Sequence, residues 1–133
     1  MKNPSEVADN PYAKAAEFRA ALRRFLRTSE DAARLAGITP HQHLLLLQIA
    51  GCPDGTTTVS KLVDKLALTQ SAVTELVQRA EQAGFVRRAA SAEDGRVVHL
   101  SLTPAGEQRL AEVHKALGPE RAKLRRVVDA LDD

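Results

Sequence analysis

The chain has 133 residues, 44% hydrophobic and 27% charged, so one domain with a single core accounts for its length. Its net charge of +2 is too weak to indicate a nucleic-acid partner by itself, and 3% aromatic content argues against ring platforms for single-stranded bases. Apolar runs of about four residues exclude a membrane-spanning helix, and the N-terminus lacks the apolar segment of a secretory signal. The lone Cys52 excludes an internal disulfide and predicts a cytoplasmic location.

A polar arm and a long helix are expected first. Residues 1–11, with two prolines, are expected to be a disordered arm. Over 12–36, apolar residues recur at spacings of three and four, which indicates an amphipathic helix that ends at Gly37. This segment carries six basic and three acidic side chains, a net charge of +3. The apolar stripe consists of Phe18, Ala21, Leu22, Phe25 and Leu26.

The second helix begins with agreeing start signals. Thr39 can cap it, Pro40 suits the first helical position, and Gln42 can complete a capping box. Four consecutive leucines then predict a central helix that is buried on most sides and ends near Ile49. The Gly and Pro residues of 51–55 predict a loop.

Two short helices joined by a tight turn are predicted next. Thr58 caps the first, which ends at Leu66, and Thr69 caps the second, which covers about 70–83. This arrangement has the shape of a helix-turn-helix. The inward positions of the second helix are expected to be Ala72, Val73, Leu76, Val77 and Ala80.

The hydrophobic period then changes from 3.6 to 2, which indicates strands. Residues 85–90 and 97–102 are predicted to form a hairpin around the polar tip 91–95. The residues expected on the buried face of its second strand are Val98, Leu100 and Leu102. Residues 56–103 hold six basic and five acidic side chains, so DNA binding would depend on placement rather than on bulk charge.

A last helical segment is predicted to start at Thr103-Pro104. Gly118-Pro119 interrupts it, and an amphipathic stretch follows. Its apolar positions before and after the interruption are Leu110, Val113, Leu117, Leu124, Val127, Val128 and Leu131.

The order of these elements, with four short segments, resembles the MarR family of bacterial regulators. The segments are ITPHQH at 38–43, LALTQSAVT at 66–74, EQAGFVRR at 81–88, and DGR at 94–96 with LSLTPAG at 100–106. The resemblance covers about 12–131. It implies a mainly α fold with a small β-hairpin wing, in which a winged helix-turn-helix core is flanked by N- and C-terminal dimerisation helices. The expected organisation is a single domain over 12–133, with dimerisation helices at 12–36 and 104–133 and a DNA-binding lobe at 56–103.

The end of the chain departs from the family pattern. The family has a further short helix after its long fifth one, and that helix contributes to the dimer interface. Counting from Leu102, it should begin near Leu131, where the chain is expected to stop. In the alternative, Gly118-Pro119 ends the fifth helix early and 120–131 form a shortened sixth. The expected dimer seam consists of Phe18, Leu22, Leu124, Val127, Val128 and Leu131.

Short polar side chains at the start of the second short helix fit a recognition helix that enters the major groove. Helix N-termini also favour phosphate, which gives the capping residues a second role. The candidates are Thr58, Ser60, Thr69, Gln70, Ser71, Thr74, Gln78 and Arg79. Glu75 and Glu81 make this helix slightly acidic, and Glu75 is expected to pair with a neighbouring cation or to reject some bases. Alternatively, these residues are only caps and a solvated surface.

On the wing, the resemblance implies that Arg96 lies at the minor groove or its phosphates and that Asp94 orients it. A narrow minor groove attracts arginine through its enhanced negative potential. Arg87 and Arg88 are expected either to contact phosphates or to pair with Asp94. The alternative for Arg96 is an ordinary surface ion pair.

The resemblance also implies a sensor site, in which a small aromatic or anionic ligand lies between the dimer helices and the DNA-binding lobe. The candidate ligand-binding residues are Phe18, Arg23, His41, His43, Leu44 and Leu47. The alternative places His43 in the core and His41 in solvent. No metal is expected, because His41 and His43 diverge on a helix and no zinc-ligand spacing occurs. Cys52 has no nearby cation in sequence to activate it.

Catalytic motifs are not found, so neither a cofactor nor an enzymatic activity is expected. The resemblance instead implies a dimeric repressor that binds a pseudo-palindromic operator in double-stranded DNA, with half-sites about one turn apart. A small ligand is expected to relieve repression by changing the distance between the DNA-binding lobes of the two subunits. The alternative is a winged-helix protein-interaction module with weak or no DNA binding, which the low charge of 56–103 favours.

Overall fold

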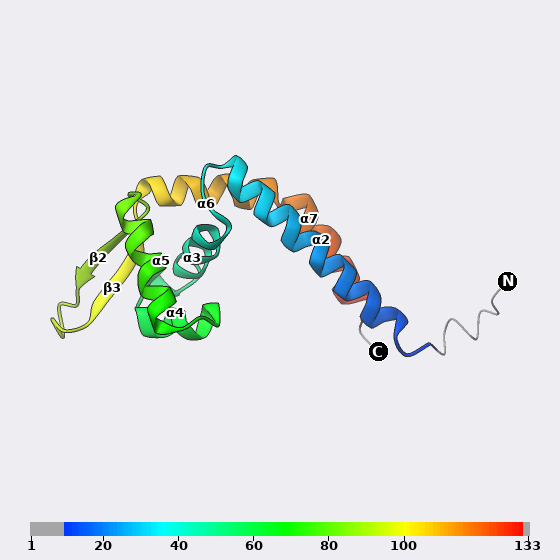
Figure 1. Cartoon of the computed structure of the whole chain (residues 1–133), viewed down its shortest axis with the longest axis horizontal. Coiled ribbons are helices and arrows are strands. Elements are labelled where there is room, and N and C mark those ends of the chain that lie inside the picture. The colour runs from blue at the N-terminus through cyan, green and yellow to red at the C-terminus, as the bar shows by residue number, and fades with distance from the viewer. Residues whose placement is uncertain (1–9, 132–133) are drawn as a thin grey trace.

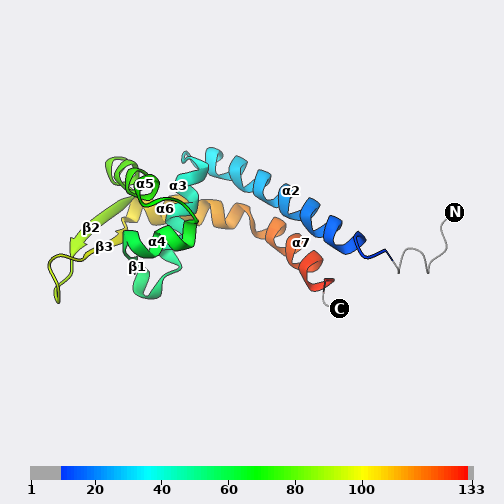
Figure 2. The same cartoon turned by 60° about the horizontal axis from the view of Figure 1, so that its bottom comes forward.

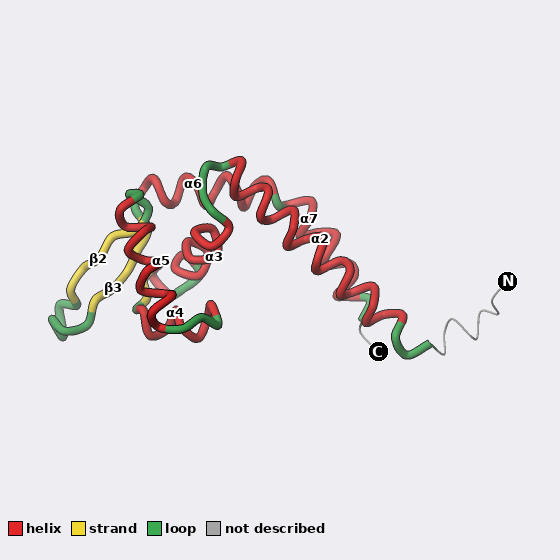
Figure 3. The backbone as a smooth tube through the Cα atoms, viewed as in Figure 1, coloured by secondary structure: helices red, strands yellow, loops and turns green. Residues whose placement is uncertain are grey.

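The computed structural model describes residues 10–131, so most of the arm predicted over 1–11 lies outside the described residues. The described chain is mostly helical with a small sheet, as predicted (Figures 1 and 3). In chain order the elements are α2 (Ala13–Leu35), α3 (Pro40–Ala50), the short 3-10 helix η1 (Pro53–Gly55), β1 (Thr56–Thr57), α4 (Val59–Leu66), α5 (Gln70–Gln82), β2 (Val86–Ala90), β3 (Val98–Leu102), α6 (Pro104–Ala116) and α7 (Gly118–Asp129).

The elements form a lobe and a two-helix arm (Figure 1). The lobe contains α3, α4, α5 and the sheet, and the β2–β3 hairpin projects from it. The arm consists of α2 and α7, which pack against each other and lead away from the lobe. A second view shows the same lobe and arm, with both ends of the described chain at the far end of the arm (Figure 2).

Threonine caps set the beginnings of four helices. The Thr39 hydroxyl accepts from the Gln42 N–H at 3.0 Å while the Gln42 side chain accepts from the Thr39 N–H at 3.0 Å, which is the predicted capping box. Thr58 and Thr69 cap α4 and α5 through the third residue beyond each, at 3.3 and 3.1 Å. Thr103 caps α6 in the same way. The predicted caps are therefore confirmed.

The sheet is antiparallel, with strand order β1-β3-β2 in the described residues. The predicted hairpin is confirmed, and its register pairs Arg87 with Ser101. The sequence reading missed β1, which pairs Thr57 with Leu100 on the other edge of β3. Three consecutive β-branched threonines were the available signal, but a two-residue strand has no period to detect.

The core lies where α3 meets α4, α5, α6 and β3. Its largest fully buried side chains are Leu45, Leu46, Ile49, Leu62, Leu100, Val73, Val77, Val113 and Thr57. The expectation that the leucine run is buried on most sides is wrong for Leu44 and Leu47, which are 42% and 39% exposed. Val98 was also expected inside but is exposed, because this end of the hairpin projects beyond the lobe (Figure 1).

The C-terminal helical segment breaks at Leu117, so α6 and α7 are separate helices. Pro119 has no N–H for the carbonyl of Lys115, and its ring crowds the preceding turn. The structure thus has the break predicted at Gly118-Pro119. The following helix begins at Gly118, whereas the alternative from the sequence placed the start of a separate helix at residue 120.

Gly106 lets α6 approach the start of the wing. A Cβ at this position would overlap the carbonyl oxygen of Phe85. That carbonyl also accepts the N–H of Thr103 at 3.0 Å, so Phe85 cannot move away without losing a hydrogen bond. The absence of a side chain at position 106 is therefore part of the junction between wing and α6.

His43 is buried on α3, only 5% exposed. Burial, with a smaller contribution from the charge of His114, lowers the pKa of His43 below its ordinary value of 6.5. His114 in turn accepts a hydrogen bond from Arg121 of α7 at 3.4 Å in the tautomer that leaves its Nε2 unprotonated. The fold therefore favours neutral His43.

Gly106→Ala is expected to destabilise the protein by about 1–3 kcal/mol through overpacking. Urea unfolding measures the effect, with Gly118→Ala as the control. A Cβ at position 118 meets only an ordinary contact at 3.9 Å, so this helical glycine tolerates alanine. Equal midpoints for the two variants would contradict the role of Gly106.

The free energy of unfolding is expected to fall as pH falls through 6.5. The unfolded chain then binds a proton at His43 that the folded chain resists, so protonation favours unfolding. His43→Phe should weaken this pH dependence, whereas His41→Asn, at an exposed position, should preserve it. Denaturation at a series of pH values tests this expectation, and identical profiles for both variants would refute it.

Candidate nucleic-acid interface

One side of α5 is polar and accessible. Gln70, Ser71, Thr74, Glu75 and Gln78 line a shallow depression on this helix. The buried residues of α5, Val73, Val77 and Ala80, anchor it to the core. Four of the predicted DNA-binding residues of α5 therefore share one surface.

The capping hydroxyls lie at the ends of the two short helices. Thr69 uses its oxygen to accept from the Ala72 N–H, and its hydroxyl hydrogen remains able to donate. Thr58 does the same on α4, while Ser60 is exposed one residue into that helix. These positions can combine a cap with a phosphate contact.

Glu75 pairs with Arg79 on the next turn of α5. The Arg79 Nη2 donates to the Glu75 Oε1 at 2.7 Å, so the predicted pairing with a neighbouring cation is confirmed. The two side chains are 63% and 70% exposed, so the pair contributes at most about 1 kcal/mol to stability. It mainly fixes where the two charges lie.

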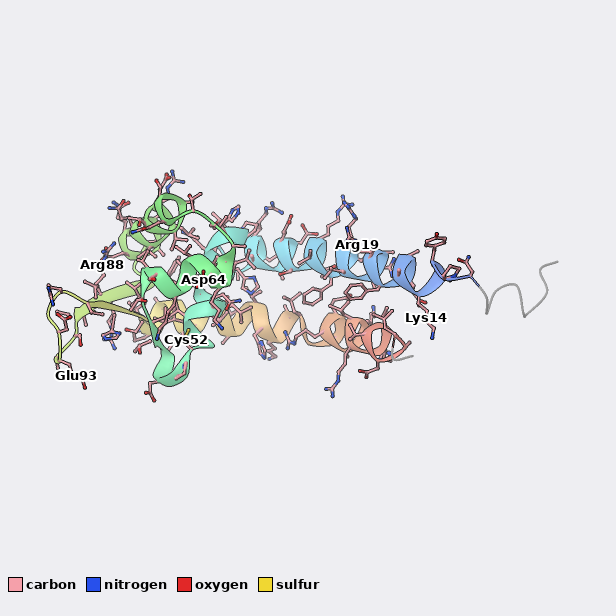
Figure 4. All side chains as sticks on the ribbon, turned by 90° about the horizontal axis from the view of Figure 1, so that it is seen from below. Lys14, Arg19, Cys52, Asp64, Arg88 and Glu93 are labelled. Carbon is pink, nitrogen blue, oxygen red and sulfur yellow. The ribbon has the colours of Figure 1, made fainter. Side chains whose placement is uncertain are left out.

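The wing tip holds Arg96 in a defined direction. The Asp94 Oδ1 accepts from the Arg96 N–H at 3.0 Å and from its Nε at 3.3 Å, yet 93% of the arginine side chain is exposed. Ser91, which the sequence reading missed as a positioning residue, accepts from the N–H groups of Glu93 and Asp94. A serine opening a polar turn was the available signal. Figure 4 shows Glu93 at this projecting tip.

Two arginines on β2 have partners other than the predicted Asp94. Arg88 pairs with Glu81 at 3.0 Å, and Arg87 donates to the Ser101 hydroxyl at 3.2 Å. The expectation of a pair with Asp94 is therefore wrong, because cross-strand and helix-end neighbours lie closer than the hairpin tip. The Arg88–Glu81 pair links the wing to the last turn of α5.

The six predicted ligand residues do not share one pocket within the described chain. Arg23 lies in a groove along α2 with Arg19 and Leu26. His41 borders a groove between α3 and α5, and Leu47 borders a cavity of about 620 Å³ next to α6. The other three are His43, which is buried, Phe18, which is half-buried, and Leu44, which is exposed.

Cys52 lies in the loop after α3, as Figure 4 shows. Its thiol donates to the Gln48 carbonyl at 3.2 Å. Contrary to the impression from the sequence, two cations lie around the same small cavity, because α4 brings Lys61 and Lys65 there. Across residues 10–131 no group of three His, Cys, Asp or Glu side chains is arranged to hold a metal. No helix in that range is long and apolar enough to cross a membrane.

The helix-turn-helix and the first part of the wing match a known sequence family. Residues 36–97 match the model of the MarR family. Over 77 residues the chain is 34% identical to the HTH-type transcriptional repressor MdtR of Bacillus subtilis (strain 168). This alignment covers 58% of the chain and 48% of MdtR, so the chain spans about half the length of this curated relative.

Solved structures show the same fold. YusO from Bacillus subtilis has a TM-score of 0.65 at 23% identity, with 99% of this chain and 88% of that chain covered. A mutant of MarR from E. coli, complexed with operator DNA, has a TM-score of 0.66 at 19% identity, with 100% of both chains covered. Residues 36–97 are therefore similar in sequence to the MarR family, and the chain has the winged helix-turn-helix fold of these solved structures.

Proposed function

We propose that the chain binds double-stranded DNA as a homodimer and regulates transcription from a pseudo-palindromic operator. The observation that carries this proposal is the pairing of an accessible polar surface on α5 with Arg96, exposed and oriented by Asp94 at the wing tip. Both features have the chemistry that duplex recognition needs. The named relatives, a repressor and a regulator solved with operator DNA, support the same function.

In the proposed complex, the N-terminal half of α5 enters the major groove. Gln70 can pair bidentately with adenine, while Ser71 and Thr74 reach bases or phosphates. The amides at the start of the helix attract a phosphate. Arg96 lies along the minor groove, where the potential is most negative. Arg87 and Arg88 flank the wing as phosphate contacts.

A second copy would cover the apolar side of the arm. Leu26 of α2 and Val128 of α7 are exposed, and Phe18, Leu22, Leu124 and Leu131 are only half-buried. A helix pair this poorly covered gains stability from a partner that removes these side chains from water. The predicted seam therefore remains our proposal for the dimer interface.

Repression and its relief by a small aromatic or anionic ligand are the finer parts of the proposal. A ligand between arm and lobe would act by favouring one separation of the two α5 helices, because binding can only shift an equilibrium between states that it distinguishes. The candidate residues occupy separate surfaces of one chain, so a complete site would require the partner subunit. We propose that the protein acts in the cytoplasm.

Arg96→Ala is expected to weaken duplex binding about tenfold or more while leaving the fold intact, because the residue is exposed and contacts only its own turn. Arg126→Ala removes the same charge from an exposed position on α7 and is the matched control. Fluorescence anisotropy with selected duplexes, at matched salt, measures the effect. Equal affinities for the two variants would remove Arg96 from the interface. An affinity for duplex DNA that does not change with salt concentration would favour the alternative of a protein-interaction module.

Light scattering is expected to give twice the chain mass of 14.4 kDa. Val128→Asp should shift the protein toward monomers, because the seam would then bury an unpaired charge. Val98→Asp introduces the same group at a similarly exposed site on the wing, 39% against 43%, and should stay dimeric. A wild-type monomer, or no difference between the variants, would contradict the proposed seam.

A further inference from the structure

Glu75 is the acidic member of the polar surface of α5. It lines the same depression as Gln70, Ser71, Thr74 and Gln78. Its side chain is 63% exposed, so it faces whatever occupies that surface. A carboxylate is unexpected on a surface that is proposed to bind DNA, because DNA is also negatively charged.

The ion pair with Arg79 leaves half of the carboxylate available. Arg79 donates to Oε1 at 2.7 Å, and none of the described residues donates to Oε2. An ionised carboxylate only accepts hydrogen bonds, so Oε2 remains able to accept one from a donor on a bound duplex. The pair thus presents one oriented acceptor.

The donor classes in the major groove are few. Guanine presents only acceptors there, and thymine presents an acceptor and a methyl group. Adenine presents its amino group beside N7, and this second acceptor repels a carboxylate. Cytosine presents its amino group with no N7 beside it. The base edge that suits a lone carboxylate oxygen best is therefore cytosine.

Arg79 also makes the approach to DNA possible. An isolated carboxylate would be repelled by the phosphates, but the guanidinium 2.7 Å away cancels its charge locally. Side chains four residues apart are neighbours on a helix, so the pair can persist without distorting α5. Arg79 is thus a positioning residue for Glu75.

We propose that Glu75, held by Arg79, selects a cytosine at one base pair of each operator half-site. The inference rests on the proposed function and deepens it, because it names a feature of the DNA that α5 recognises.

The experiment selects duplexes from a random library with the full chain, and then repeats the selection with Glu75→Gln. The wild type should show one cytosine-preferring position per half-site, with about tenfold discrimination by affinity. Glu75→Gln should lose that preference or shift it toward adenine, the base that glutamine pairs with. Glu81→Gln is the matched control, since it removes the other arginine-paired carboxylate of α5 and should keep the preference.

A second pair of variants tests the role of Arg79. Arg79→Ala should weaken the cytosine preference, and Arg79→Lys should restore part of it, because lysine returns the positive charge beside Glu75. A merely structural role for Arg79 would lower affinity for every duplex by the same factor.

Three outcomes would overturn the inference. In the first, Glu75→Gln binds every duplex more tightly with unchanged preference, so Glu75 only repels phosphate. In the second, Glu75→Gln and Glu81→Gln select the same sequences as the wild type. In the third, the wild type binds no duplex at all, and the proposed function fails with the inference. The first two outcomes leave the proposed function standing.

Discussion

The contact between α6 and the start of the wing governs the geometry of the lobe. The Phe85 carbonyl accepts the Thr103 N–H, the Thr103 hydroxyl donates to the Gly84 carbonyl, and Gly106 packs directly against Phe85. Gly84 follows the end of α5, and Thr103 follows the end of β3. This cluster therefore joins α5, the wing and α6, the helix that leads to the arm. A shift in any one of them has to move the other two.

Features that depend on local chemistry were predictable from the sequence. The capping box of Thr39 and Gln42, the hairpin, and the break before Pro119 all depend on residues close in the chain. Burial was less predictable. Leu44 and Leu47 carry the same side chain as Leu45 and Leu46, and only tertiary packing decides which of them faces the core.

The candidate site also has one part that could be predicted from local chemistry and one part that could not. The polar start of α5 and the Asp94–Arg96 contact follow from helix and turn chemistry. The partners of Arg87 and Arg88 were not predictable, because Ser101 and Glu81 come close only after the strands pair and pack on α5. The predicted ligand residues do not converge within the described chain, because α2 and α3 place them on separate surfaces.

Under the proposed function, the arginines around the polar surface of α5 and the wing have a kinetic consequence. Arg79, Arg88 and Arg96 each have a carboxylate of the same chain within 3.3 Å, so these three arginines add little positive field beyond the surface of the lobe. Long-range attraction accelerates encounter only when such a field extends through the ionic atmosphere. If the protein binds DNA as proposed, it should meet DNA at ordinary diffusive rates, and the lifetime of the complex, rather than the speed of its formation, should distinguish an operator from other sequences.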